Sequence, residues 1–145
     1  MELKLPPPLL FVFCLLLIYL LPSGEHYPLP QWLGFLFAGV GIAVSVAGLY
    51  ALKQAKTTIS PVTPQQSSQL VTWGIYRFSR NPMYLGLMFL LIAWAVWLNR
   101  YFASLVIIGF VYYLNRFQIK SEERALQKKF EESFTQYCRQ VRRWL

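Results

Sequence analysis

The sequence contains no aspartate and only one histidine, His26, among its 145 residues. Its two cysteines, Cys14 and Cys138, are far apart and belong to no CxxC or Cys/His cluster. Zinc sites and disulfide frameworks need several ligands or paired cysteines at characteristic spacings. The sequence therefore predicts neither a metal site nor a disulfide framework.

Charged residues of either sign are scarce as well. Charged residues make up 14% of the chain and hydrophobic residues 56%, whereas soluble domains carry about 25% charged residues. This composition is typical of a chain whose solvent is largely lipid. The length suits one domain, which we expect to cover residues 1–145.

Four apolar stretches, at residues 9–21, 32–52, 83–98 and 101–119, predict an all-α polytopic membrane protein with about four transmembrane helices. A helix needs about 20 residues to span the hydrocarbon, and only the second stretch reaches this length comfortably. The third and fourth are joined by Asn99 and Arg100 alone, which predicts a tight helical hairpin over residues 83–119. The first stretch, extended to residue 5, also resembles a signal peptide. Because no small-residue cleavage site follows it, we favour a retained helix, so that residues 5–52 hold the first two spans.

Basic residues gather in two segments, residues 53–82 and the tail from residue 116 onward. The loop from residue 22 to 31 has no Lys or Arg, and the hairpin tip has only Arg100. The positive-inside rule then places both basic segments and both termini in the cytoplasm. The same clustering explains the net charge of +8 without a nucleic-acid partner, which we do not expect.

Small residues line one face of the second stretch. Gly34, Ala38, Gly41, Ser45 and Gly48 follow one another at spacings of four and three. Small residues allow membrane helices to approach closely. This face is therefore predicted to pack against another helix.

The tail, residues 120–145, has the pattern of an amphipathic helix. Its apolar residues Leu126, Phe130, Phe134, Tyr137 and Val141 recur at helical spacing. Such a helix either folds over the cytoplasmic ends of the membrane helices or lies on the lipid headgroups as a surface anchor.

Two places in the cytoplasmic segments suit a zwitterionic ligand. Asn81 and Pro82 predict a helix start, and its free amide groups, with Arg80 beside them, suit a carboxylate. Glu122 or Glu123 suits an ammonium group. The alternatives are a capped helix with an interfacial arginine, and a solvated acidic pair bound to nearby cations.

Three motifs stand out in these segments: Leu70-Val71-Thr72-x-Gly74-x-Tyr76, Ser79-Arg80-Asn81-Pro82-Met83-Tyr84-Leu85-Gly86, and Glu122-Glu123-x-x-Leu126 followed by Arg143-Trp144. Together they resemble the isoprenylcysteine carboxyl methyltransferase family. Phospholipid methyltransferases and sterol reductases share the general membrane architecture of that family. The resemblance covers residues 53–145.

This resemblance implies a membrane enzyme that binds S-adenosylmethionine at its cytoplasmic face and methylates a lipid-like or isoprenoid-linked acceptor. The donor would be held by the loop of residues 53–82, the helix start after it and a glutamate beyond the hairpin. With Arg80 added from the helix-start argument, the cofactor-binding candidates are Gln69, Leu70, Val71, Tyr76, Arg80, Asn81, Pro82, Met83, Tyr84 and Glu122. The catalytic candidates are Arg116 and Glu123.

The chain departs from the eukaryotic members of this family at two positions. Asn81 stands where they have His, and Gln118 stands where they place an Arg assigned to the acceptor carboxylate. Since Asn cannot titrate near neutral pH, no imidazole base acts at this position. An acceptor that is already nucleophilic, such as a carboxylate on a lipophilic molecule from the bilayer, fits best.

Two other functions remain open from the sequence. One is an NADPH-dependent reductase on the same architecture, in which Arg77 and Arg80 would bind the extra phosphate. The other is a non-catalytic membrane scaffold whose basic tail binds membrane lipids.

Overall fold

The computed structural model describes residues 5–24, 28–56 and 69–145. Every regular element in these ranges is a helix, which confirms the all-α prediction. The elements are α1 (Pro7–Leu20), α2 (Gln31–Gln54), the 3-10 helix η2 (Gly74–Arg77), α3 (Pro82–Trp97), α4 (Ala103–Tyr113), the π-helix η3 (Leu114–Ile119) and α5 (Lys120–Gln140).

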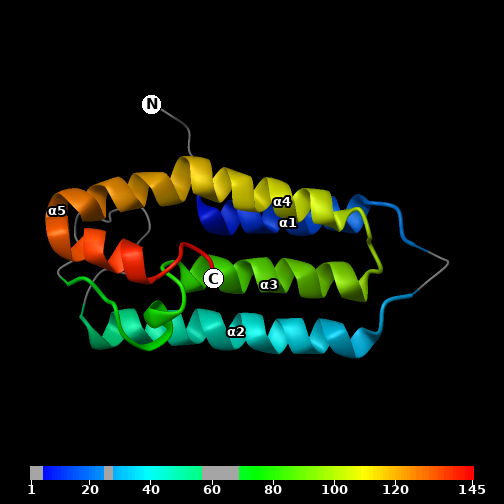
Figure 1. The fold of residues 1–145 in the computed structure, drawn as a ribbon. Coiled ribbons are helices and arrows are strands. Elements are labelled where there is room, and N and C mark those ends of the chain that lie inside the picture. The colour runs from blue at the N-terminus through cyan, green and yellow to red at the C-terminus, as the bar shows by residue number, and fades with distance from the viewer. Residues whose placement is uncertain (1–4, 25–27, 57–68) are drawn as a thin grey trace.

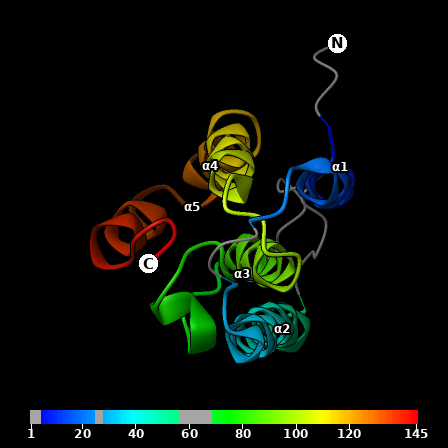
Figure 2. The same ribbon diagram turned by 90° about the vertical axis from the view of Figure 1, so that its right-hand side faces the viewer.

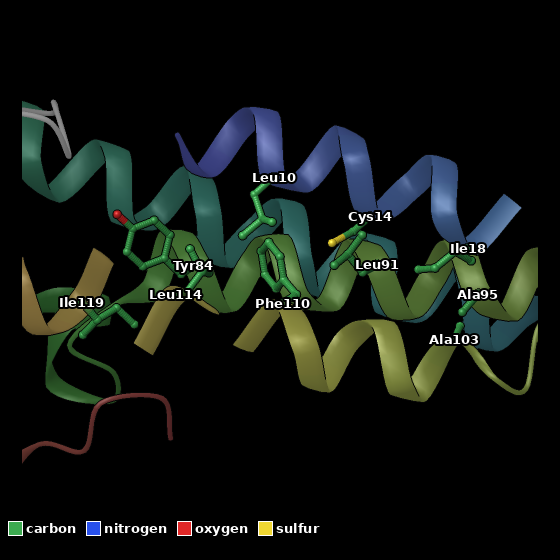
Figure 3. Close-up of a cluster of buried hydrophobic side chains, with 10 residues drawn as sticks. All are labelled: Leu10, Cys14, Ile18, Tyr84, Leu91, Ala95, Ala103, Phe110, Leu114 and Ile119. Carbon is green, nitrogen blue, oxygen red and sulfur yellow. The ribbon is translucent and has the colours of Figure 1, made fainter. Parts of the chain in front are cut away.

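Helix α3 lies at the centre of the bundle, with α1, α2 and α4 around it (Figures 1 and 2). The main core forms where α1 and α4 meet α3. Cys14 and Ile18 of α1 lie there with Leu91 of α3 and Phe110 of α4, all of them buried (Figure 3). Apolar contacts on two sides thus fix the position of α3.

The third side of α3 packs on the small-residue face of α2, as the sequence predicts. A Cβ atom added to Gly86 would lie 2.7 Å from the carbonyl oxygen of Gly41, and one added to Gly41 would lie 2.9 Å from the carbonyl oxygen of Gly86. A Cβ atom added to Gly48 would lie 3.0 Å from the ring of Pro82, the first residue of α3. The two backbones are therefore close enough to exclude side chains at the crossing.

Replacing Gly86 by Ala should lower the free energy of unfolding by about 1–3 kcal/mol, because the new methyl group forces the two helices apart. Gly109→Ala in α4 is the matched control, since a Cβ there meets nothing within 4 Å. Thermal unfolding of both variants in detergent measures the difference. Equal melting temperatures would contradict the close crossing.

Among the described helices, α2 is long and apolar enough to cross a membrane, with 24 residues. Helices α1 and α3 are apolar but shorter, with 14 and 16 residues. The four-span count therefore stays a prediction. The end of α2, η2, the start of α3 and α5 all lie at one end of the bundle (Figure 1), so the basic segments on these elements share that end.

The tail differs from the single amphipathic helix that its sequence predicts. Helix α5 continues from α4 through η3, but its backbone reverses at Glu131, which has φ 45° and ψ −114°. The second part of α5 then runs back toward the start of α3 (Figure 1). A periodic sequence does not reveal such a reversal, because both arms turn their apolar residues toward one shared cluster.

That cluster forms a second, smaller core at the same end of the bundle. Its buried members are Phe134, Tyr137 and Val141, and Leu70 and Tyr76 from the segment before α3 pack against it. The apolar face of the tail is thus covered by the chain itself. This corresponds to the folded-back alternative rather than to a helix that lies on headgroups.

Candidate functional site

Helix α3 begins as the sequence predicts, with Asn81 at the N-cap position and Pro82 as the first helical residue. The Asn81 side chain does not cap the helix, however. Its Nδ2 atom donates a hydrogen bond to the carbonyl oxygen of Arg143 at 3.0 Å, and its backbone N–H donates to Oγ of the buried Ser79 at 3.1 Å. The amide of Asn81 is thereby used to fasten the C-terminus of the chain.

Residues 141–145, the C-terminal segment, hold the start of α3 in place. The backbone N–H of Arg80 donates to the carbonyl oxygen of Arg142 at 3.0 Å. Trp144 donates from Nε1 to Oδ1 of Asn115 in the π-helix at 3.1 Å. Sequence reasoning missed the structural roles of Ser79 and Asn115, because no local pattern relates them to the distant C-terminus.

Tyr84 and Glu122 meet although they are 38 positions apart, as expected for the open end of the hairpin. The Tyr84 hydroxyl donates to Oε1 of Glu122 at 2.6 Å, and Nε2 of Gln118 donates to the same atom at 2.7 Å. π-Helical turns are frequent at functional sites. Here η3 supplies Gln118, one turn before Glu122.

The environment of Glu122 disfavours its negative charge. Burial raises the pKa of this carboxyl above its ordinary value, and the hydrogen bonds from Tyr84 and Gln118 only partly oppose that effect. Both of these donors are neutral. A cationic group placed beside Glu122 would oppose this effect and favour the charged form of the carboxyl.

Glu123 has the opposite environment. Arg143 donates to it from Nε at 3.0 Å and from Nη2 at 2.6 Å, and Nη2 of Arg80 lies 3.3 Å from its Oε1 atom. The hydrogen bonding to Glu123 raises the pKa of Arg143. Of the two adjacent carboxylates, Glu123 is thus already paired with two arginines, whereas Glu122 accepts hydrogen bonds from neutral donors.

Neighbouring groups pair with only some of the hydrogen-bond donors of the Arg80 side chain. Its Nη1 atom contacts Sγ of Cys138, and its Nη2 atom faces Glu123. Its Nε atom is buried and has no hydrogen-bond partner among the described residues. Because an arginine has five donors and a buried unused donor is costly, this guanidinium suits an incoming carboxylate.

The cofactor-binding candidates that precede α3 differ in their burial and contacts. Gln69 is exposed, Val71 is buried, and Leu70 and Tyr76 pack against the second core. Tyr137 donates from its hydroxyl to the carbonyl oxygen of Tyr76 at 2.7 Å. Burial and the charge of Glu122 both raise the pKa of Tyr76. Tyr76 thus lies within electrostatic reach of Glu122, whereas Leu70 contributes to packing.

Arg116 is exposed on η3, where its guanidinium carbon lies 5.8 Å from the centre of the Phe117 ring. It lines an open cavity of about 480 Å³ together with Lys120, Glu123, Arg124, Gln127, Phe134 and Cys138. The structure thus brings the two catalytic candidates, Arg116 and Glu123, to one cavity. This cavity lies beside the carboxylate pair, since Glu123 borders it and Glu122 turns toward α3.

The sequence pattern of the phospholipid methyltransferase family matches residues 29–133, most of the chain. The chain belongs to this family. Phospholipid methyltransferases transfer methyl groups to lipid-like substrates, and the matched region includes the start of α3 and both glutamates.

A relative of this family member is an uncharacterized protein from Haemophilus influenzae. It is 44% identical over 63 residues, which are 43% of the present chain and the whole of the relative. No solved structure matches the chain.

Neutralising Glu122 should stabilise the ligand-free protein. Burial raises the pKa of the Glu122 carboxyl above its ordinary value in the folded protein, so the unfolded chain loses this proton at lower pH. Stability therefore falls as pH rises from the ordinary glutamate pKa through the raised pKa of the folded protein. Glu122→Gln should abolish this decline and raise the melting temperature at neutral pH.

Thermal unfolding across a pH series measures this effect, with Glu132→Gln as the control because Glu132 is exposed. The control should keep the wild-type pH profile. A lower melting temperature for Glu122→Gln at neutral pH, with the decline intact, would contradict the assigned environment.

Proposed function

We propose that this protein transfers the methyl group of S-adenosylmethionine to a lipophilic acceptor at the cytoplasmic face of a membrane. One observation carries the proposal. At one end of the bundle, the half-buried carboxylate of Glu122, which accepts hydrogen bonds from the neutral donors Tyr84 and Gln118, lies one residue before the partner of a guanidinium with an unused donor among the described residues. This pair of groups is complementary to the ammonium and carboxylate of an amino acid, which S-adenosylmethionine contains.

The chain's own residues fit this donor molecule. Glu122 would bind its ammonium group, and Arg80 would bind its carboxylate through the unused Nε atom. The aromatic faces of Tyr84 and Tyr76 attract a cation, which the sulfonium is. S-adenosylmethionine supplies an activated methyl group that is transferred by in-line displacement. The protein therefore mainly has to position the two reactants and exclude water.

The acceptor most compatible with these residues is a carboxylate on a lipid-like or isoprenoid-linked molecule. No titratable base stands at Asn81, so the acceptor must be nucleophilic without losing a proton there. Arg116, at the cavity beside Glu123, would bind the acceptor's negative charge. Membrane lipids would surround the apolar helices and deliver the acceptor laterally.

We expect S-adenosylhomocysteine, the reaction product, to bind the wild-type protein and to raise its melting temperature, as any ligand specific to the folded state does. Glu122→Gln should weaken this binding by roughly ten- to a hundredfold, because one charge-assisted contact is lost. Calorimetric titration measures the change, and the exposed Glu132→Gln variant should bind like wild type.

NADPH serves as the competing ligand in the same measurement. Stabilisation by NADPH and none by S-adenosylhomocysteine would indicate a reductase. Stabilisation by neither would indicate a non-catalytic scaffold.

The proposed topology has four spans and places both termini in the cytoplasm. Ser23, in the loop after α1, and Thr72, before η2, should then face opposite sides of the membrane. Single cysteines introduced at these positions, in a protein lacking Cys14 and Cys138, should react with an impermeant maleimide from opposite sides. Labelling of both from one side would disprove this topology.

A further inference from the structure

We propose that Glu123 is an internal counter-ion that competes with the ligand's carboxylate for Arg80 and so limits how tightly the ligand binds. This inference rests on the proposed function, because it concerns the carboxylate of S-adenosylmethionine and its product. It assigns Glu123 a positioning and tuning role rather than direct contact with the reacting atoms.

The contacts of Arg80 are the first evidence. Its guanidinium has one ion-pair contact with Glu123, at 3.3 Å, and its side chain is 14% exposed. Its Nε donor is buried and has no partner among the described residues. Arg80 is therefore neither fully paired nor solvated, and it can still bind a second anion on its Nε side.

The second line of evidence is that Arg143 holds the Glu123 carboxylate independently of Arg80. Two hydrogen bonds from Arg143, at 3.0 and 2.6 Å, fix the carboxylate in a geometry that matches the planar guanidinium. Arg143 is itself fastened through its carbonyl oxygen, which accepts a hydrogen bond from Asn81. Glu123 therefore stays beside Arg80 when a ligand arrives.

A ligand carboxylate bound to Arg80 would then lie close to a second, fixed carboxylate. Two like charges on one guanidinium repel each other, and this repulsion weakens only ligands that carry the negative charge. S-adenosylmethionine and S-adenosylhomocysteine have the same carboxylate, so Glu123 weakens the binding of both. The product then dissociates faster, which favours turnover when product release limits the rate.

The test compares two ligands on the Glu123→Gln variant, in which the side chain keeps its size but loses its charge. S-adenosylhomocysteine carries the carboxylate, and 5′-methylthioadenosine lacks the whole amino-acid portion. The variant should bind S-adenosylhomocysteine roughly five- to tenfold more tightly than wild type. Its affinity for 5′-methylthioadenosine should not change, and Glu123→Asp should restore the wild-type preference.

A second variant has the opposite expected sign. In the Arg143→Gln variant, Glu123 no longer pairs with Arg143 and should pair more strongly with Arg80. The affinity for S-adenosylhomocysteine should therefore fall several-fold. The affinity for 5′-methylthioadenosine should again be unchanged. This variant keeps the inference testable if Glu123→Gln does not fold.

The outcomes separate the inference from the proposed function. If wild type binds S-adenosylhomocysteine but Glu123→Gln binds it equally or less tightly, the counter-ion role is wrong and the methyltransferase proposal stands. Parallel changes for both ligands would show a purely structural role for Glu123. If wild type does not bind S-adenosylhomocysteine, both proposals are overturned.

Discussion

The ion-pair cluster of Arg80, Glu123 and Arg143 is the interaction on which the functional end of this bundle depends. It joins the start of α3, the first turn of α5 and the C-terminal segment, three parts of the chain that are distant in sequence. The side chains are only partly exposed, at 14% for Arg80, 19% for Glu123 and 31% for Arg143. Removing one partner would leave a poorly solvated charge, which is more damaging than the loss of a surface pair.

Close packing elsewhere in the bundle is what lets this cluster form. The glycine contact between α2 and α3 fixes the central helix on one side, and the core around Leu91 and Phe110 fixes it on the others. The short connection after α3 then returns the chain to the same end. Tyr84 and Glu122 are brought within hydrogen-bonding distance by this hairpin rather than by any local preference.

The two adjacent glutamates illustrate how neighbouring side chains acquire different chemistry. Successive residues on a helix point in different directions, so Glu122 faces the interior near Tyr84 while Glu123 faces the arginines. Burial raises the pKa of the Glu122 carboxyl, whereas the Glu123 carboxylate is already paired with arginines. Two consecutive carboxylates therefore differ in their surroundings, since Glu122 accepts hydrogen bonds from neutral donors and Glu123 pairs with two arginines.

The sequence alone determined the helical class, the positions of the helices, the start of α3 at Pro82, the small-residue face of α2 and the resemblance to membrane methyltransferases. These features depend on local periodicity, proline geometry and short motifs. Each of them involves only residues that are close together in the sequence. The reversal at Glu131 and the attachment of the C-terminal segment to Asn81 were decided only by the tertiary structure. So was the difference between Glu122 and Glu123, because burial and the identity of a charged partner depend on residues that only folding brings together.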